Sequence, residues 1–260
     1  MVNNKAVKKV LKIILSLIFW LLVWQIASML VSENLKLFLV SPIDVFKKFL
    51  ELCTTKSFYL ATFSSILRVI FGFALGAVSG IVFGILTCEI SLFDIIFSPA
   101  FKVIRAVPVV SFIILAYLFI DVNTLPIFIA FLMVLPLVWQ TTHDSLKTAA
   151  TRRVEMGKVF GLNRAQILLK IKFPAVLNEI ISVSISGLGF AWKSGVAAEV
   201  LCSPAISLGK ILLKAKNNID YDEVYAITLT VVILSIIIEI FFKYLCKLYI
   251  NRRRRRYAEI

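Results

Sequence analysis

The chain has 260 residues, of which 60% are hydrophobic and only 17% are charged, with a mean hydropathy of +0.94. Soluble domains carry about a quarter charged residues, so this composition excludes an ordinary water-soluble protein and indicates that lipid is the solvent. The net charge of +14 does not indicate nucleic-acid binding, because the basic residues gather at the ends of apolar runs, where they set orientation.

The apolar runs predict an all-α membrane protein with six spans. A transmembrane helix needs about 20 apolar residues, and six runs approach or exceed this length: 10–31, 61–87, 97–120, 125–140, 174–200 and 224–250. The first run is too long for the core of a signal peptide, so we interpret it as a span. In this arrangement 18 of the 29 Lys and Arg residues fall in cytoplasmic segments and 7 fall outside, which predicts two cytoplasmic termini.

Helix signals along the chain refine these spans. Ser41 followed by Pro42 starts a short amphipathic helix after the first span, since the first helical residue needs no N–H. Pro99 and Pro108 interrupt the third span, and Pro136 kinks the fourth. The second span contains glycines at a spacing of four, which favours close contact with another helix over a substrate path. These are Gly72, Gly76, Gly80 and Gly84.

We expect neither a catalytic site nor a metal site in this chain. The four cysteines are scattered and His143 is the only histidine, so no metal cluster or disulfide framework is predicted. The sequence has no G-x-x-x-x-G-K-[ST] phosphate loop, and energy from ATP would therefore enter through a partner. We expect no cofactor bound to the chain itself.

The basic segment 143–173 is patterned as two short helices just inside the membrane. One apolar side of the first helix would contain Leu146, Ala149, Ala150, Val154 and Phe160. Gly161 follows where a helix needs a left-handed terminating residue. Asn163 and Gln166 then make a capping-box pattern for a second helix that ends before Pro174. This helix–glycine–helix unit would offer a compact surface to a partner protein.

The same segment resembles the EAA loop of binding-protein-dependent ABC importer permeases. That pattern is Glu-Ala-Ala, three residues, Gly, nine residues, Ile, one residue and Leu-Pro. This chain has Glu155-Met156-Gly157, Gly161, Ile171 and Phe173-Pro174 at the same spacing. Met156 and Gly157 replace the alanines, and Phe173 replaces the leucine. The likeness extends over roughly residues 40–245.

Other stretches resemble the nitrate/sulfonate/taurine branch of that family. Arg105-Ala-Val-Pro108 is similar to its Arg-Ala-Ile-Pro element, and the stretch from Gly187 to Glu199 is similar to its Gly…Ala-Trp…Val-Ala-Glu pattern. The resemblance implies a MetI-like type I ABC importer permease fold. Its parts would be an N-terminal helix and amphipathic segment (1–56), a permease core (57–246) and a basic cytoplasmic tail (247–260).

Several partners follow from the resemblance. It implies a multi-pass transport subunit of the bacterial inner membrane, not an enzyme, with ATP bound by a cytoplasmic P-loop ATPase dimer. The residues implied for ATPase coupling are Glu155, Gly157, Gly161, Ile171 and Pro174. It also implies an external solute-binding protein on segments 32–58 and 200–223, and a second copy or close relative around a path. The solute would be nitrate-, sulfonate- or taurine-like, or vitamin-related.

Polar residues within spans are candidates for that path, because lipid disfavours them. We expect the path near Trp192, Lys193, Glu199 and Pro108. For Lys193 the simpler alternative is snorkelling or pairing with another span.

Other charges in spans have structural interpretations. Arg68 and Arg105 would serve packing or interfacial anchoring, and Glu239 would pair with Lys243 one helical turn away.

Two other functional classes stay open. One is an ATPase-independent secondary transporter or channel, for which neither an internal repeat nor deep charges in several helices are evident. The other is a membrane anchor or assembly factor.

Overall fold

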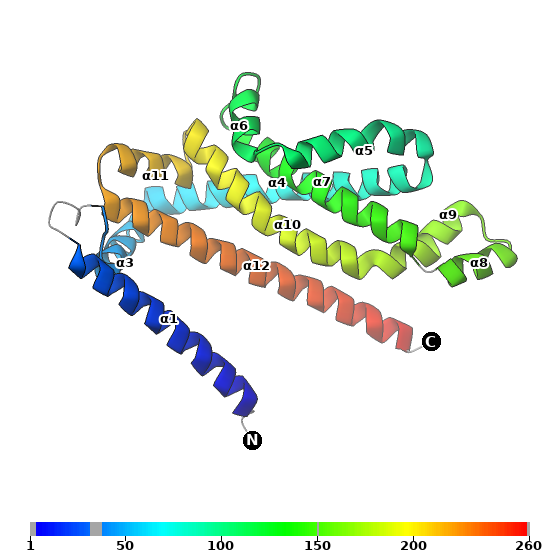
Figure 1. Cartoon of the computed structure of the whole chain (residues 1–260), viewed down its shortest axis with the longest axis horizontal. Coiled ribbons are helices and arrows are strands. Elements are labelled where there is room, and N and C mark those ends of the chain that lie inside the picture. The colour runs from blue at the N-terminus through cyan, green and yellow to red at the C-terminus, as the bar shows by residue number, and fades with distance from the viewer. Residues whose placement is uncertain (1–3, 32–37, 150, 259–260) are drawn as a thin grey trace. The chain divides into compact units, whose positions relative to one another are not determined.

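The computed structural model describes residues 4–31, 38–149 and 151–258. The chain divides into two compact units, Met1–Tyr59 with Ile211–Val232 and Leu60–Lys210 with Ile233–Ile260. Its helices, in chain order, are α1 (Asn4–Leu30), α3 (Pro42–Leu52), α4 (Lys56–Glu89), α5 (Ser91–Ala106), α6 (Val109–Tyr117), α7 (Leu125–Thr148), α8 (Thr151–Val159), α9 (Arg164–Ile167), the π-helix η1 (Leu168–Lys172), α10 (Phe173–Cys202), α11 (Leu208–Asn217) and α12 (Tyr221–Ala258) (Figure 1).

Within the described residues, four helices are long and apolar enough to cross a membrane. They are Lys56–Glu89, Leu125–Thr148, Arg164–Cys202 and Tyr221–Leu248. The predicted third span is a pair of helices, α5 and α6, bent by 103° at Pro108, and it supplies a fifth crossing if the pair counts as one. The predicted interruption at Pro99 is wrong, because this proline lies inside α5. The apolar part of α1, Ile14–Leu30, is shorter than these four helices. The all-helical membrane architecture is confirmed, whereas the predicted count of six spans is not exact.

The predicted end of the fourth span at Gln140 is wrong. α7 continues to Thr148, because Pro136 is accommodated inside it and no further proline or glycine interrupts it. Leu146 therefore lies in α7 and not in a separate loop helix. It is fully buried and packs with Val176 and Ile180. Ala150, which the same pattern includes, lies outside the described residues.

The glycines of α4 form the contact of this helix with α7 in the second unit. A Cβ added at Gly76 would lie 2.8 Å from the carbonyl oxygen of Phe131, and one at Gly80 would lie 2.8 Å from that of Leu135. A side chain here would meet backbone, which cannot move aside as a flexible side chain can. The glycines therefore serve helix packing, as predicted, and leave no room for a substrate path between these two helices.

Aromatic side chains connect the elements of the first unit. The indole Nε1 of Trp24 in α1 donates a hydrogen bond of 3.1 Å to the carbonyl oxygen of Val40, and its ring lies 5.8 Å from that of Tyr225 in α12. The rings of Phe38 and Tyr221 are 5.1 Å apart. Tryptophan and tyrosine are enriched at membrane–water interfaces, so this aromatic cluster indicates the level of a membrane surface.

The helix α3 is held at the same level. The Ser41 hydroxyl caps its N-terminus by accepting the N–H of Asp44 at 3.2 Å, and Pro42 occupies the first turn as predicted. The Nζ of Lys48 lies 3.0 Å from a carboxylate oxygen of Asp220, directly before α12. This hydrogen bond raises the pKa of Lys48 above its usual value.

Candidate functional site

The turn after α8 is a complete helix-terminating motif. Gly161 has φ of +74°, in the left-handed region that favours glycine, as predicted. Its N–H donates to the carbonyl oxygen of Lys158, and the N–H of Leu162 donates to that of Gly157, each over 3.0 Å. These two bonds define a Schellman motif, which satisfies the last carbonyl groups of α8. The chain reverses here on backbone geometry that a β-branched residue disfavours.

The two short helices pack on each other through Gly157. A Cβ built on Gly157 would lie 2.8 Å from Cδ1 of Ile171, 3.4 Å from Leu162 and 3.6 Å from Ile167. Gly157 and Ile171, both predicted as coupling residues, are thus brought into contact across the turn. This small apolar core joins α8 to η1, so the two elements can move as one body.

The second short helix does not end before Pro174, contrary to the prediction. The capping box of Asn163 and Gln166 starts α9 as expected. The N–H of Gln166 donates to Oδ1 of Asn163 over 2.8 Å, and the N–H of Asn163 donates to Oε1 of Gln166 over 3.0 Å. The π-helix η1 then continues into α10, and the N–H of Phe173 donates to Leu168 five residues earlier. A wide π turn rearranges the backbone bonds that a proline would otherwise break, so Pro174 fits in the first turn of α10.

Side chains also fasten this segment to the membrane helices. The Nζ of Lys172 in η1 lies 2.6 Å from a carboxylate oxygen of Glu89 at the end of α4. Leu168 and Phe173 pack against the buried cluster of Leu146, Val176 and Ile180. A displacement of α8 and η1 would therefore be transmitted directly to α4, α7 and α10.

The outer side of α8 is exposed and partly apolar. The exposed fractions are 58% for Met156, 85% for Val159 and 78% for Phe160, and we call these three residues the α8 patch. With Glu155 and Arg152 they line an open hollow of about 460 Å³. Phe160 follows α8 directly and is exposed, whereas Val154, on the same predicted apolar side, is half-buried. Glu155 is exposed beside the patch.

Comparison with known proteins identifies the family. The family described as binding-protein-dependent transport system inner membrane component matches residues 76–255. The chain belongs to this family. The nitrate import permease protein NrtB of Synechocystis sp. is 27% identical over 194 residues, which cover 74% of this chain and 70% of that protein. The taurine transport system permease protein TauC of Escherichia coli is 25% identical over 210 residues, which cover 78% and 76%.

Solved structures agree in fold. An amino acid ABC transporter chain has a TM-score of 0.62 at 14% identity and matches 80% of this chain and 96% of its own. A chain of the MetNI methionine ABC transporter in an inward-facing conformation has a TM-score of 0.57 at 16% identity. The match covers 75% of this chain and 93% of the transporter chain. The predicted MetI-like fold and the function as the membrane permease subunit of an ABC importer are confirmed.

The four residues that the sequence predicts for the translocation path of this permease differ in exposure. Trp192 and Glu199 are buried, with exposed fractions of 1% and 0%. Lys193 is exposed on α10, and Pro108 is exposed at the bend between α5 and α6.

Glu199 instead joins three elements of the second unit. The Ser65 hydroxyl of α4 donates a hydrogen bond of 2.6 Å to one carboxylate oxygen of Glu199. A guanidinium nitrogen of Arg68 lies 3.2 Å from the other oxygen. The N–H of Gly209 at the start of α11 donates to Glu199 over 3.4 Å. The Ser65 oxygen also accepts the N–H of Leu208 at 3.0 Å. A fully buried carboxylate with these partners fixes α4, α10 and α11, and Arg68 acts in packing as predicted.

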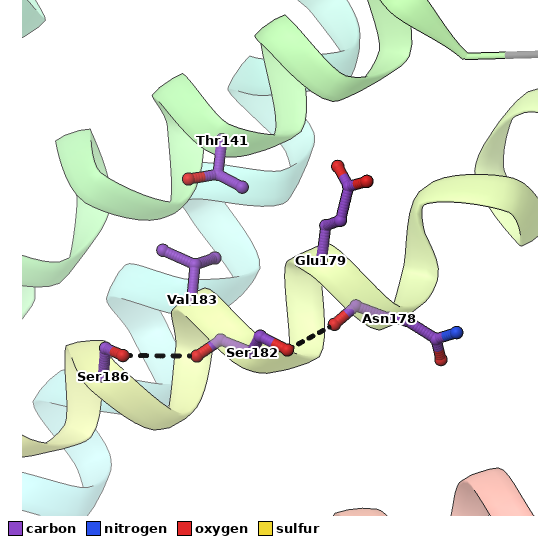
Figure 2. A pocket seen from close by; sticks show the side chains of 6 residues that line it. All are labelled: Thr141, Asn178, Glu179, Ser182, Val183 and Ser186. Carbon is purple, nitrogen blue, oxygen red and sulfur yellow. Dashed lines mark hydrogen bonds between the residues drawn. The ribbon is translucent and has the colours of Figure 1, made fainter.

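Sequence reasoning missed a polar groove along α10. Figure 2 shows its lining, with side chains from α10 and one from α7: Thr141, Asn178, Glu179, Ser182, Val183 and Ser186. The groove is open and has a volume of about 450 Å³. Ser182 and Ser186 donate to backbone carbonyl groups one turn earlier, over 2.8 and 3.4 Å. The repeat of Asn178, Ser182 and Ser186 at a spacing of four was the available signal.

The exposed faces of α4 and α10 differ in chemistry. On α4 the large exposed side chains are apolar, as a lipid-facing surface requires: Leu60, Phe63, Leu67, Ile70, Phe71, Leu75, Val78 and Val82. The exposed face of α10 instead continues from Ser186 through Phe190 to Lys193. Phe190 also lines a second hollow, of about 270 Å³, together with Arg105 of α5 and Pro136 of α7. Arg105 donates to Gln140 there.

Proposed function

We propose that the segment from α8 to η1 couples this permease to a cytoplasmic P-loop ATPase, which binds and hydrolyses the ATP. The observation that carries this proposal is the α8 patch, because three large apolar side chains stand exposed on a body stiffened by the Schellman turn and the capping box. Exposed apolar groups of this kind indicate a protein interface. Glu155 and Arg152 beside the patch add charged groups to its rim.

Closure of an ATPase dimer would push this body as a unit. The ion pair of Lys172 with Glu89 and the packing of Leu168 and Phe173 on α7 and α10 provide the mechanical connection. The helices would then rock between inward- and outward-facing states, a rigid-body transition between two arrangements. In this proposal both termini are cytoplasmic, and a solute-binding protein docks on segments 32–58 and 200–223, of which residues 32–37 lie outside the described structure.

A substitution in the α8 patch tests the coupling proposal. The Phe160→Ser variant is expected to weaken retention of the ATPase of its own transport system on the order of tenfold in co-purification, as for an aromatic interface anchor. The matched control is Ile206→Ser, which also removes an exposed apolar side chain, 51% exposed, but lies just after the other end of α10. Equal ATPase retention by both variants would contradict the proposal.

We further propose that the polar groove of α10 lines the translocation path, formed with a second copy or a close relative. Polar side chains facing hydrocarbon are costly, so the exposed Asn178 and Glu179 favour contact with water or protein over lipid. The relatives are named for nitrate, bicarbonate and taurine. A small solute with an anionic oxygen group is therefore our proposed cargo, and Arg105 and Lys193 are cationic groups beside its route.

Cysteine labelling tests this path. In a background without Cys53, Cys88, Cys202 and Cys246, the Ser182→Cys and Ser186→Cys variants are expected to react with a membrane-impermeant thiosulfonate in reconstituted importer. The control is Val78→Cys, which is 62% exposed on the apolar face of α4 and should react far more slowly. Labelling at Val78→Cys as fast as at the two serine positions would refute the assignment, and so would an absence of labelling at both serine positions.

A further inference from the structure

The helix α3 presents three chemically different sectors. At 100° per residue, each sector covers an arc of about 60°. Val45, Lys48 and Leu52 form the packed sector; Val45 and Leu52 are buried, and Lys48 is bound to Asp220. Asp44, Lys47 and Glu51 form an exposed charged sector. Ile43, Phe46 and Leu50 lie next to the charged sector, on the side away from the packed sector, and we call them the apolar sector.

The apolar sector has no cover within the described structure. Ile43 and Phe46 are each 56% exposed, and Leu50 is 50% exposed. In the neighbouring charged sector, the Nζ of Lys47 lies 3.3 Å from a carboxylate oxygen of Asp44. A helix with one packed, one apolar and one charged side fits a position where protein, lipid and water meet.

The contacts of α3 fix its level relative to the ends of the apolar helices α1 and α12. Its Lys48 binds Asp220, and α12 begins one residue later with polar side chains before its apolar stretch. Trp24 of α1 donates a hydrogen bond to the backbone of Val40, two residues before α3, and its ring lies tilted beside that of Tyr225. The helix is therefore fastened where two apolar helices, α1 and α12, end or begin. The aromatic cluster marks the same level.

We propose that α3 is an interfacial anchor, with Ile43, Phe46 and Leu50 inserted into the lipid surface at the headgroup–acyl boundary. Helices of this amphipathic kind lie in the membrane plane with the apolar face roughly 5–10 Å deep in that boundary. The charged sector then faces the headgroups and water. Lipid is favoured over a protein occupant because three side chains are far fewer than the 20 or so residues that each partner contributes to a stable interface.

Spin labels on the two exposed sectors test the anchor. In the cysteine-free full chain reconstituted in phosphatidylcholine vesicles, labels are placed at Phe46→Cys and, as the matched control on the same helix, at Glu51→Cys. The accessibility of each label to oxygen, which concentrates in lipid, is compared with that to a water-soluble nickel chelate. The logarithm of the oxygen-to-nickel ratio is expected to be positive at Phe46→Cys and negative at Glu51→Cys.

Two outcomes would overturn the anchor. A negative logarithm at both positions would place the apolar sector in water. Protection of the Phe46→Cys label from both oxygen and nickel would show that protein covers it, either a second copy or another subunit. Leu50→Cys repeats the measurement on the same sector, which distinguishes a local disturbance by one label from the true depth. The readout requires neither transport nor a bound ATPase, so it stands apart from the proposed coupling.

Discussion

Replacement of Gly161 by valine is expected to uncouple ATP hydrolysis from transport in the reconstituted importer. Gly161 has φ of +74°, and a left-handed backbone costs a residue with a Cβ about 1–2 kcal/mol. A Cβ at this position would meet nothing within 4 Å, so the effect arises from backbone conformation alone and not from a clash. The turn would open, and α8 would lose its fixed angle to η1. Solute uptake per ATP hydrolysed is the quantity to measure.

The Gly161→Asn variant is the matched control. Asparagine tolerates the left-handed region far better than a β-branched residue, so it should keep most of the coupled uptake. Both substitutions place a side chain in the same open space, and only their backbone preferences differ in the relevant way. Normal coupling in Gly161→Val, or equal loss in both variants, would show that the left-handed turn is not what transmits the force.

The turn between α8 and α9 could be predicted from sequence because its signals are local. The left-handed glycine and the Asn163–Gln166 capping box each depend on hydrogen bonds between residues at most five apart. Such bonds leave the same residue pattern wherever they occur. The contact of Gly157 with Ile171 could not be predicted from spacing alone. It forms only because the chain reverses direction at Gly161.

The predicted path residues stay a prediction, because residue type does not tell which face of a helix meets water. Glu199 was a reasonable candidate from its charge, but its partners Ser65 and Arg68 lie more than 130 residues earlier in the chain. The polar groove, in contrast, is lined mainly by residues such as Ser182 and Ser186 that are common in ordinary membrane helices. Only the packing of α10 on α7 decides that this face stays open.

Local signals did not show where a helix continues through a proline. The sequence placed a break before Pro174 because proline disfavours helix in the residue before it. The π-helix η1 removes that conflict, and tertiary packing of Leu168 and Phe173 stabilises the continuous element. The third span shows the opposite outcome, since Pro108 stands at a bend of 103° between α5 and α6.

Replacement of Arg68 by methionine is expected to be the most destabilising change in the second unit. Removal of one partner from a buried ion pair leaves an uncompensated charge and costs about 3–5 kcal/mol. Here the remaining carboxylate, Glu199, is 0% exposed. Thermal unfolding of the detergent-purified chain should show a large fall in Tm. The control is Lys47→Met on α3, outside the membrane-crossing helices, whose partner Asp44 is 51% exposed one turn away, because such surface pairs contribute only about 0.3–0.5 kcal/mol.

The two partners should not be equivalent, and the double variant tests this. Glu199→Gln keeps an acceptor for Ser65 and leaves Arg68 with its 2.8 Å bond to the carbonyl oxygen of Ile206, so its loss in Tm should be smaller than that of Arg68→Met. Combining Arg68→Met with Glu199→Gln removes both charges and should restore part of the Tm lost in Arg68→Met alone. If the double variant unfolds at or below the Tm of Arg68→Met, then the buried charge is not the source of the instability. Lost packing of the long Arg68 side chain against α10 and the segment before α11 would then account for it.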